Sequence, residues 1–196
     1  MSTRRAVFLD RDGVINALVP DPQTGNPESP LHPDDVVLLS GVAEAMGRLA
    51  AAGFLLVGAS NQPAAAKGTV SREELIAVQE RAISLLAAEG ASFDDFRICW
   101  HHPEASVREL QAVCDCRKPA PGMLLDAAHA NDIDLSNSWM VGDGAADVLA
   151  GASAGTATVL IEHPLSAHRR RAACSPTLIA ADLPAAVSAL LVYIGC

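Results

Sequence analysis

The sequence AVFLDRDGVIN at residues 6–16 decides how the rest of the chain is interpreted. It opens with the apolar run AVFL, which is too short for a helix and predicts a buried strand. Asp10 and Asp12 follow that strand directly, and Gly13 comes after them. Carboxylates at the carboxyl end of a parallel strand lie where open α/β sheets build their sites, whereas an isolated pair of this spacing also occurs in plain turns. Whether Asp10 and Asp12 belong to a functional site or to a plain turn therefore depends on the rest of the sequence.

Strand-like and helix-like segments alternate along the chain. Short apolar runs predict further strands at 54–59, 96–100, 138–141 and 156–161. Helical spacing of apolar residues predicts helices at 42–50, 71–88, 123–130, 145–154 and 183–192. The alternation predicts an α/β fold with a doubly wound parallel sheet. At 196 residues we expect one domain, residues 1–196, without a separate cap, and with a polar loop at 20–35 over the mouth of the site.

Composition limits the classes of partner. The net charge of −9 argues against nucleic acid but not against a phosphorylated substrate, which a few local cations can bind. No secretory signal is evident, and the longest apolar stretch, 184–194, is too short to cross a bilayer. We therefore expect a cytoplasmic monomer with no membrane partner. In that reducing compartment the five cysteines are not expected to form disulfides. The run Arg169-Arg170-Arg171 is interpreted as a solvated charged surface.

Further polar groups follow the predicted strands. Ser60 ends the second strand, Asp143 follows the fourth, and Lys118 lies in the segment between them. The carboxyl ends of parallel strands meet at one edge of a sheet, so we expect these groups close to Asp10. Taken alone, Ser-Asn-Gln after the second strand is just as typical of a surface turn.

The order Asp-x-Asp, Ser, Lys and Gly-Asp resembles the haloacid dehalogenase superfamily of phosphohydrolases. The resemblance implies that Asp10 attacks phosphorus and forms an aspartyl-phosphate, and that Asp12 acts as general acid and then as general base. It also implies that Ser60, together with the Asn61 amide, binds the phosphoryl oxygens and that Lys118 supplies positive charge to the transition state.

A divalent cation is part of the same expectation. A phosphate dianion repels an anionic nucleophile, and Mg²⁺ prefers the oxygen ligands that carboxylates and carbonyls provide. By resemblance, the Asp10 carboxylate, the Asp12 backbone carbonyl and Asp143 hold this Mg²⁺. Asp147 is expected to orient Lys118 or a metal-bound water, and the alternative is an acid on a helix surface.

The loop at 99–118 carries a second signal, Cys-x-His-His followed by Cys-Asp-Cys-Arg-Lys. Three thiolates and an imidazole suit a structural, four-coordinate Zn²⁺, and the alternative is a group of buried free cysteines. From chemistry alone, the imidazole is either His101 or His102. A metal here would stiffen the loop that carries Arg117 and Lys118.

The motifs Cys-x-His-His-Pro and Cys-Asp-Cys-Arg-Lys-Pro-x-Pro-Gly-Met, with a long spacer, resemble the D-glycero-D-manno-heptose 1,7-bisphosphate phosphatases. The similarity covers most of the chain. It assigns zinc to Cys99, His101, Cys114 and Cys116, and substrate recognition to Arg117. The related histidinol-phosphate phosphatases share the pattern with a shorter spacer, so the separation of Cys99 and Cys114 favours the heptose branch.

Three features depart from that family. Pro63-Ala64 stands where the family usually continues Ser-Gly, and Gly144 stands where heptose enzymes often have a lysine. The loop at 18–33 also lacks the usual substrate-contact sequence. These departures leave the phosphatase chemistry unchanged and bear on the identity of the substrate.

We therefore expect a Mg²⁺-dependent phosphomonoester hydrolase that removes the C7 phosphate of heptose 1,7-bisphosphate, with the second phosphate near Arg117. The first alternative is a phosphatase for histidinol phosphate or another small sugar phosphate. The second is a non-catalytic sugar-phosphate-binding protein on the same fold.

Overall fold

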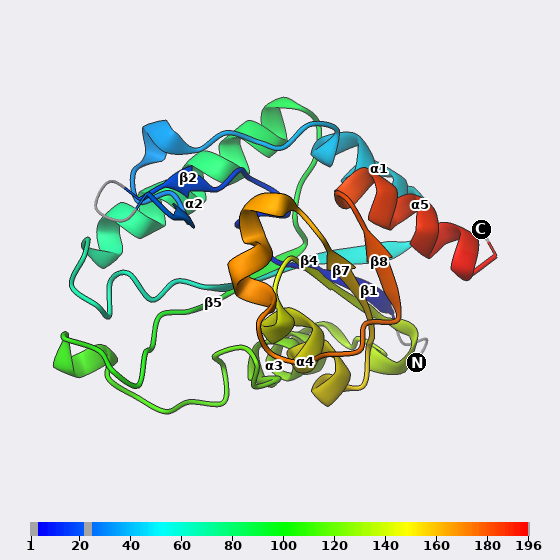
Figure 1. The fold of residues 1–196 in the computed structure, drawn as a ribbon. Helices are drawn as coiled ribbons and strands as arrows, with labels where there is room; N and C mark the ends of the chain where they lie inside the picture. Colours follow the sequence, from blue (N-terminus) through cyan, green and yellow to red (C-terminus); the bar gives the residue numbers. More distant parts are fainter. Residues whose placement is uncertain (1–3, 22–24, 196) are drawn as a thin grey trace.

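A six-stranded parallel sheet forms the centre of the protein (Figure 1), whose computed structural model describes residues 4–21 and 25–195. The strands follow the order β5-β4-β1-β6-β7-β8 across the sheet. Their bounds are β1 (Arg5–Leu9), β4 (Phe54–Asn61), β5 (Asp95–Cys99), β6 (Trp139–Gly142), β7 (Ala157–Ile161) and β8 (Leu178–Ala180). The predicted doubly wound α/β fold is confirmed, and the single-domain organisation stays a prediction.

Helices cover both faces of the sheet. The α-helices are α1 (Val42–Ala51), α2 (Arg72–Ala88), α3 (Gly122–Asn131), α4 (Ala145–Ala154) and α5 (Leu183–Tyr193). Short 3-10 turns are η1 (Pro33–Asp35), η2 (Arg108–Leu110), η3 (Leu135–Asn137) and η4 (Pro164–Arg170). Helices α1 and α5 pack together on one face, and α3 and α4 pack together on the other (Figure 1). Each helix expected from apolar spacing is present.

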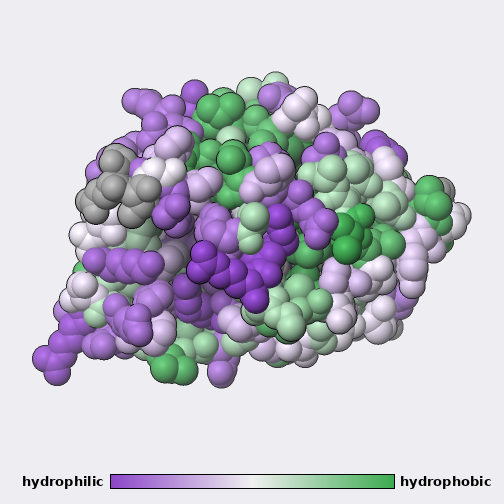
Figure 2. Space-filling view, in the orientation of Figure 1, coloured by the Kyte–Doolittle hydropathy of each residue, from purple (hydrophilic) through white to green (hydrophobic). Residues whose placement is uncertain are grey.

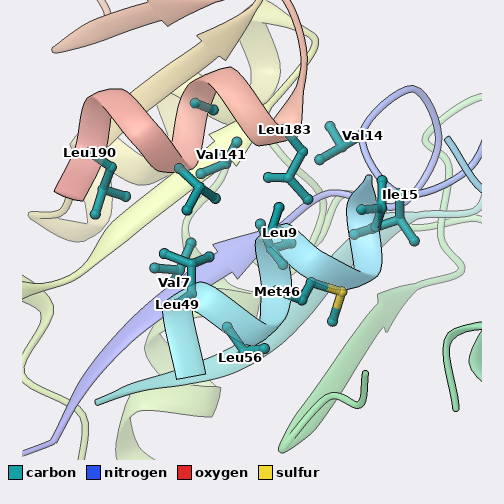
Figure 3. Packing of buried hydrophobic residues seen from close by; sticks show 14 of the residues in the cluster. Val7, Leu9, Val14, Ile15, Met46, Leu49, Leu56, Val141, Leu183 and Leu190 are labelled. Atoms are coloured by element: carbon teal, nitrogen blue, oxygen red, sulfur yellow. The ribbon is translucent and has the colours of Figure 1, made fainter. Parts of the chain in front are cut away.

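Strand β1 divides the core into two apolar layers because alternate side chains of a strand point to opposite faces. Val7 and Leu9 pack with Leu49 of α1 and Leu183 of α5, as Figure 3 shows. Phe8 packs in the opposite layer, with residues of α3. Burial on both faces explains why this strand is an unbroken apolar run in the sequence.

Helix α2 begins at a capping box, as its sequence predicts. Ser71 Oγ accepts a hydrogen bond from the Glu74 N–H at 3.1 Å, and the Glu74 carboxylate accepts one from the Ser71 N–H at 2.9 Å. The helix packs against η1. None of the helices in the described part of the chain is long and apolar enough to cross a membrane.

Two segments differ from the sequence prediction. Strand β8 was not predicted, because three residues with a largely exposed Ile179 give no clear apolar run. The segment at 20–35, predicted as a loop, includes an antiparallel pair, β2 (Val19–Pro20) and β3 (Pro27–Glu28), followed by η1. Residues 22–24 of that predicted loop lie outside the described residues.

Candidate active site

The candidate site lies where the sheet changes its direction of winding. Strand β1 pairs with β4 on one side and with β6 on the other, and ligands of open α/β sheets bind at such switch points. Asp10 follows β1, and its N–H donates to the Val141 carbonyl of β6 at 3.0 Å. Gly13 has a φ of 90°, and a Cβ there would collide with the Asp143 carboxylate. The glycine of the first motif therefore lets the loops after β1 and β6 approach each other.

Lys118 is a buried cation in contact with the Asp10 carboxylate. Its Nζ lies 3.0 Å from Asp10 Oδ1 and 2.5 Å from Asp147 Oδ1, and it donates to the Ala59 carbonyl at 2.6 Å. Burial by itself lowers the pKa of Lys118, but the carboxylates of Asp10 and Asp147 raise that pKa above its usual value. Asp147 is buried and contacts Lys118, so the alternative of an acid on a helix surface is wrong, and the role of Asp147 toward Lys118 or a metal-bound water stays a prediction.

Asp10, Asp143 and Asp147 form an acidic cluster, whose carboxylate oxygens lie within 4.8 Å of one another. Burial raises the pKa of Asp10, against the opposing charge of Lys118. Burial also raises the pKa of Asp143 to about 7, although the Arg169 guanidinium lowers it. Crowded and desolvated carboxylates need further positive charge to stay ionised. A hard cation such as Mg²⁺ supplies that charge to oxygen ligands, so the donor set fits the expected metal.

Asp12 belongs to a separate network of hydrogen-bond donors. Arg11 donates to it from Nε at 3.0 Å and from Nη2 at 3.1 Å, Asn16 donates at 3.0 Å, and Gln62 donates at 2.7 Å. Burial raises the pKa of Asp12, but these donors hold it below its usual value. Arg11 also donates to Gln79 of α2 at 3.0 Å, which ties the loop to that helix. In this conformation Asp12 is a carboxylate, suited to accept a proton.

Ser60 and Asn61 reach the site from the end of β4. The buried Ser60 hydroxyl accepts a hydrogen bond from Gln62 Nε2 at 2.9 Å, which leaves its own O–H for another acceptor. Asn61 holds the backbone of Lys118, because its Nδ2 donates to the Lys118 carbonyl at 3.0 Å and its Oδ1 accepts from the Lys118 N–H at 3.1 Å. The sequence prediction gave Asn61 a role toward substrate, and these bonds add a role in placing the lysine.

The prediction of a solvated charged surface at Arg169-Arg170-Arg171 is wrong for Arg169. Its Nη1 donates to the Asp12 backbone carbonyl at 2.9 Å and lies 3.4 Å from each carboxylate oxygen of Asp143. Its side chain is only 20 % exposed. Turn η4 carries this run across the site, and Figure 2 shows a strongly hydrophilic patch over that turn. A residue-by-residue interpretation of a charged run cannot reveal such a tertiary placement.

A cavity of about 370 Å³ opens over the site. Three further cations, Lys67, Arg117 and Arg169, share its lining with the acidic cluster and Lys118. Glu28 and Ser29 also line it, so the segment at 20–35 reaches the mouth of the site as expected. A neighbouring cavity of about 680 Å³ shares Glu28, Ser29 and Lys67 with the first. A ligand at Asp10 therefore has room to extend toward Lys67.

The thiol cluster consists of Cys99, His101, Cys114 and Cys116, whose ligand atoms lie within 4.8 Å of one another. Cys116 Sγ lies 3.1 Å from the sulfurs of Cys99 and Cys114 and 3.4 Å from His101 Nδ1. Cys99 Sγ lies 3.6 Å from Cys114 Sγ and 4.0 Å from His101 Nδ1. Tetrahedral ligands about 2.3 Å from a zinc ion are roughly 3.7 Å apart, a value inside the range of these separations, and three thiols with one imidazole are a donor set typical of that metal. His102 instead accepts from the Glu104 N–H, which resolves the choice of imidazole.

The thiol cluster connects directly to the site. Arg117 Nη1 donates to the backbone carbonyl of His101 at 3.3 Å, and Lys118 is the next residue along the chain. The segment that presents both cations is therefore held at one end by the thiol cluster and at the other by Asn61.

Sequence reasoning missed several residues of the site, among them Asn16, which also donates to Asp12, and Lys67, which lines the cavity. Arg11 and Gln62 hold Asp12, and Arg169 contacts Asp143. Arg11 lies between Asp10 and Asp12, and Gln62 follows Asn61, so their places in the sequence could have indicated that they belong to the site. Arg169 offered none, because its contact with Asp143 spans 26 residues and depends on η4.

Comparisons with known proteins agree with this geometry. Residues 115–186 match the family model described as HAD-hydrolase-like. The solved D,D-heptose 1,7-bisphosphate phosphatase from B. bronchiseptica, complexed with magnesium and phosphate, superposes with a TM-score of 0.78 at 31% identity. The match covers 96% of this chain and 99% of that one. Fold and site thus place the chain in the HAD-like hydrolase class.

Relatives in sequence narrow that class. The chain is 40% identical over 157 residues to D-glycero-beta-D-manno-heptose-1,7-bisphosphate 7-phosphatase from Vibrio cholerae, with 80% of each chain covered. It is 36% identical over 188 residues to the enzyme of that name from Yersinia pestis, with 94% of this chain and 95% of the relative covered. The chain belongs to the heptose 1,7-bisphosphate phosphatase family, a family of phosphatases.

Proposed function

We propose that this protein removes the C7 phosphate of D-glycero-β-D-manno-heptose 1,7-bisphosphate in a Mg²⁺-dependent reaction that passes through an aspartyl-phosphate on Asp10. The observation that carries the chemistry is the 3.0 Å contact between Lys118 Nζ and Asp10 Oδ1 inside the acidic cluster. It places a potential nucleophile beside a permanent positive charge at the switch point of the sheet. The substrate rests on the names of the relatives and on the cations of the cavity.

The Asp10 carboxylate, the Asp12 backbone carbonyl and the Asp143 carboxylate would hold the Mg²⁺. When bound, this ion neutralises charge on the phosphate and on the nucleophile. The placement of Arg169 supports this ligand set, because one of its nitrogens faces the Asp12 carbonyl and the Asp143 carboxylate at once. The B. bronchiseptica relative was solved with magnesium and phosphate.

In the first step, an Asp10 oxygen forms a bond to phosphorus while the bond to the sugar oxygen breaks. Lys118 and the Ser60 hydroxyl face the charge that spreads over the phosphoryl oxygens. Asp12 gives its proton to the leaving alkoxide. The contacts with Arg11, Asn16 and Gln62 favour the carboxylate form of Asp12, so the protonated form would be bound less tightly by these donors.

In the second step, water hydrolyses the aspartyl-phosphate. Asp12, now a carboxylate, takes a proton from the attacking water, and Asp10 is regenerated as inorganic phosphate leaves. The donors around Asp12 suit this step as they stand, because they stabilise the charged base. Asp147 keeps Lys118 protonated throughout.

Zn²⁺ is the metal we propose for the thiol cluster, where it would act structurally. Soft sulfur ligands and one imidazole favour zinc over Mg²⁺, whereas the acidic cluster favours the reverse. The His101 carbonyl then presents a fixed acceptor to Arg117. The zinc would support catalysis only by holding the loop.

The second phosphate of the substrate would lie near Arg117 and Lys67, which line the cavity together. A guanidinium has five N–H donors, and the His101 carbonyl occupies only one of its nitrogens here. The planar fork that remains can pair with phosphate oxygens. A monophosphate would leave this end of the cavity without its charged partner.

The test is a comparison of initial rates of phosphate release from the β anomer of heptose 1,7-bisphosphate and from histidinol phosphate, both with Mg²⁺. We expect a far higher kcat/KM for the bisphosphate, and acid-quenched enzyme should carry a phosphoryl group on the Asp10 peptide in mass spectrometry. Equal kcat/KM values, or a preference for histidinol phosphate, would refute the substrate. No release from a wide panel of phosphorylated metabolites would favour a binding protein instead.

A further inference from the structure

Arg169 occupies a position that the proposed reaction leaves unexplained. Its Nη1 lies 2.9 Å from the Asp12 carbonyl oxygen and 3.4 Å from both carboxylate oxygens of Asp143. These are two of the three groups that the proposed function assigns to Mg²⁺, and the inference below rests on that assignment. The guanidinium thus lies where the acidic cluster presents its oxygens to a cation.

We propose that Arg169 is an internal counter-ion that competes with Mg²⁺ for these oxygens and has to leave when the metal binds. Mg²⁺ approaches its oxygen ligands to about 2.0–2.1 Å. A guanidinium nitrogen already bonded to one of those oxygens would then be in near contact with the metal, and like charges at such separations repel strongly. The two cations cannot share this position.

The local structure separates the anchoring of η4 from the side chain of Arg169. Arg170 fixes the turn, since its Nη1 donates to Ser166 Oγ at 2.9 Å and to the His163 carbonyl at 3.1 Å. The turn lies beside Gly144, because a Cβ added there would be in ordinary van der Waals contact with the Arg169 carbonyl oxygen, at 3.5 Å. The turn can therefore stay in place while the Arg169 side chain rotates.

Space for the displaced guanidinium is present. Arg169 lines the 370 Å³ cavity together with its neighbour His168. A side chain that leaves Asp12 and Asp143 can enter this cavity without movement of the backbone, and it then adds positive charge where a phosphorylated substrate would lie.

The charges of the site predict how loss of Arg169 changes the affinity for Mg²⁺. Three carboxylates of the acidic cluster face Lys118 and Arg169. Without Arg169, the metal-free site loses one of the two cations that form ion pairs with the acidic cluster in the described part of the chain, so the free protein becomes less stable while the Mg²⁺-bound state is unaffected by the lost contact. Removing a competitor raises the fraction of protein ready to bind, and the apparent dissociation constant falls in proportion.

The experiment is calorimetric titration of Mg²⁺ into the full chain after dialysis free of Mg²⁺ with zinc retained. Arg169→Gln should bind Mg²⁺ at least roughly tenfold more tightly than the parent, as expected for loss of a charge-assisted competitor. Arg171→Gln is the matched control, because it removes an exposed arginine of the same run, and it should bind like the parent. Asp143→Asn should lose Mg²⁺ binding.

A second measurement is needed if Arg169→Gln is too unstable to be studied without Mg²⁺. Arg169→Gln is purified in Mg²⁺, and its Tm is followed as the Mg²⁺ concentration is lowered; its Tm should depend more strongly on Mg²⁺ than that of the parent at low concentration. If Arg169→Gln binds Mg²⁺ no more tightly than the parent and Asp143→Asn still loses binding, then Arg169 is not a competitor of Mg²⁺, while the proposed metal site stands. Unchanged binding in Asp143→Asn overturns the metal site itself and this inference with it.

Discussion

The acidic cluster and the thiol cluster are both sets of metal ligands, and the protein balances their charge in opposite ways. The acidic cluster contacts Lys118 and Arg169 directly. The sulfur atoms of the thiol cluster contact one another and His101, and burial raises the pKa values of Cys99 and Cys116 above the usual thiol value. The acidic cluster therefore has cations beside its ligands, whereas the ligands of the thiol cluster contact one another and have to lose protons when a metal binds.

This difference implies a division of labour. Loss of a ligand from the acidic cluster should reduce the catalytic rate without unfolding the protein, because Lys118 and Arg169 still pair with the remaining carboxylates. Loss of a ligand from the thiol cluster should reduce stability and leave the chemistry, because a bound metal would cross-link the two loops that carry the ligands.

The largest effect is expected for Asp10→Asn. The amide can neither attack phosphorus nor serve as an anionic metal ligand, so kcat should fall by at least about 1,000-fold. The Tm should change little, since Asp147 still pairs with Lys118. Steady-state kinetics and thermal unfolding measure the two halves of the prediction. Asp126→Asn on the exposed face of α3 is the control. Near-parental turnover by Asp10→Asn would show that the covalent mechanism is wrong.

The next effect concerns the thiol cluster. Cys116→Ser removes the sulfur nearest to its three partners, so zinc should fall from about one per chain to near zero by elemental analysis. We expect a loss of roughly 3 kcal/mol, or about 6–12 °C in Tm, with measurable kcat remaining. Cys174→Ser, outside the cluster, should retain the metal. If Cys116→Ser keeps the zinc content and the Tm of the parent, the proposal that this cluster binds a structural zinc is wrong.

A smaller effect is expected where the two clusters meet. Arg117→Ala should reduce kcat/KM for the bisphosphate by about 10–100-fold and for a monophosphate by less than about threefold, because it removes binding of the remote phosphate. Arg108→Ala, an exposed arginine of the same loop, is the control. Equal losses on both substrates would mean that Arg117 acts on the reacting phosphate, or only through the loop.

The smallest effect depends on pH. In the folded protein, Arg11, Asn16 and Gln62 hold the pKa of Asp12 below its usual 3.8, although burial opposes them. Folding therefore favours the carboxylate. Its stabilising contribution is complete above about pH 4 and is lost as the pH falls through the lowered pKa.

Asp12→Asn tests this contribution in urea unfolding without Mg²⁺. The variant should be less stable than the parent by about 1–3 kcal/mol at pH 6, because Arg11 loses its charged partner inside the protein. The difference should narrow toward pH 3. A difference that stays constant over this range would contradict the ionised state of Asp12.

The parts of the site that the sequence predicted are those that depend only on strand ends. Asp10, Ser60 and Asp143 follow apolar runs, and parallel strands bring such positions to one edge of a sheet. The thiol ligands were predictable for a similar reason, because their spacing places them on one loop. Local sequence also identified the helices of both faces, through apolar spacing and the Ser71 capping box.

The missed parts depend on contacts between segments that share no pattern. Arg11 is a charged residue with 1 % exposure, and only the fold explains how Asp12 and Gln79 compensate its burial. Arg169 lies in a run that resembles an exposed surface, but η4 turns Arg169 toward Asp12 and Arg170 toward Ser166, and only Arg171 of the three is exposed. Strand β8 is defined by its pairing with β7 rather than by its own three residues.

The central place of β1 has a consequence for how the chain is made. Phe8 can pair with Val57 early in synthesis, but the other edge of β1 waits for Met140. Until then a nascent chain exposes one edge of its most apolar strand, and sheets completed by distant segments form slowly. Asp10 and Asp143 meet only when that edge closes. A ribosome-bound chain therefore contains Asp10 but not yet Asp143 for most of its translation. Asp143 is synthesised directly after β6, the strand that covers the open edge of β1 and so removes a site of aggregation.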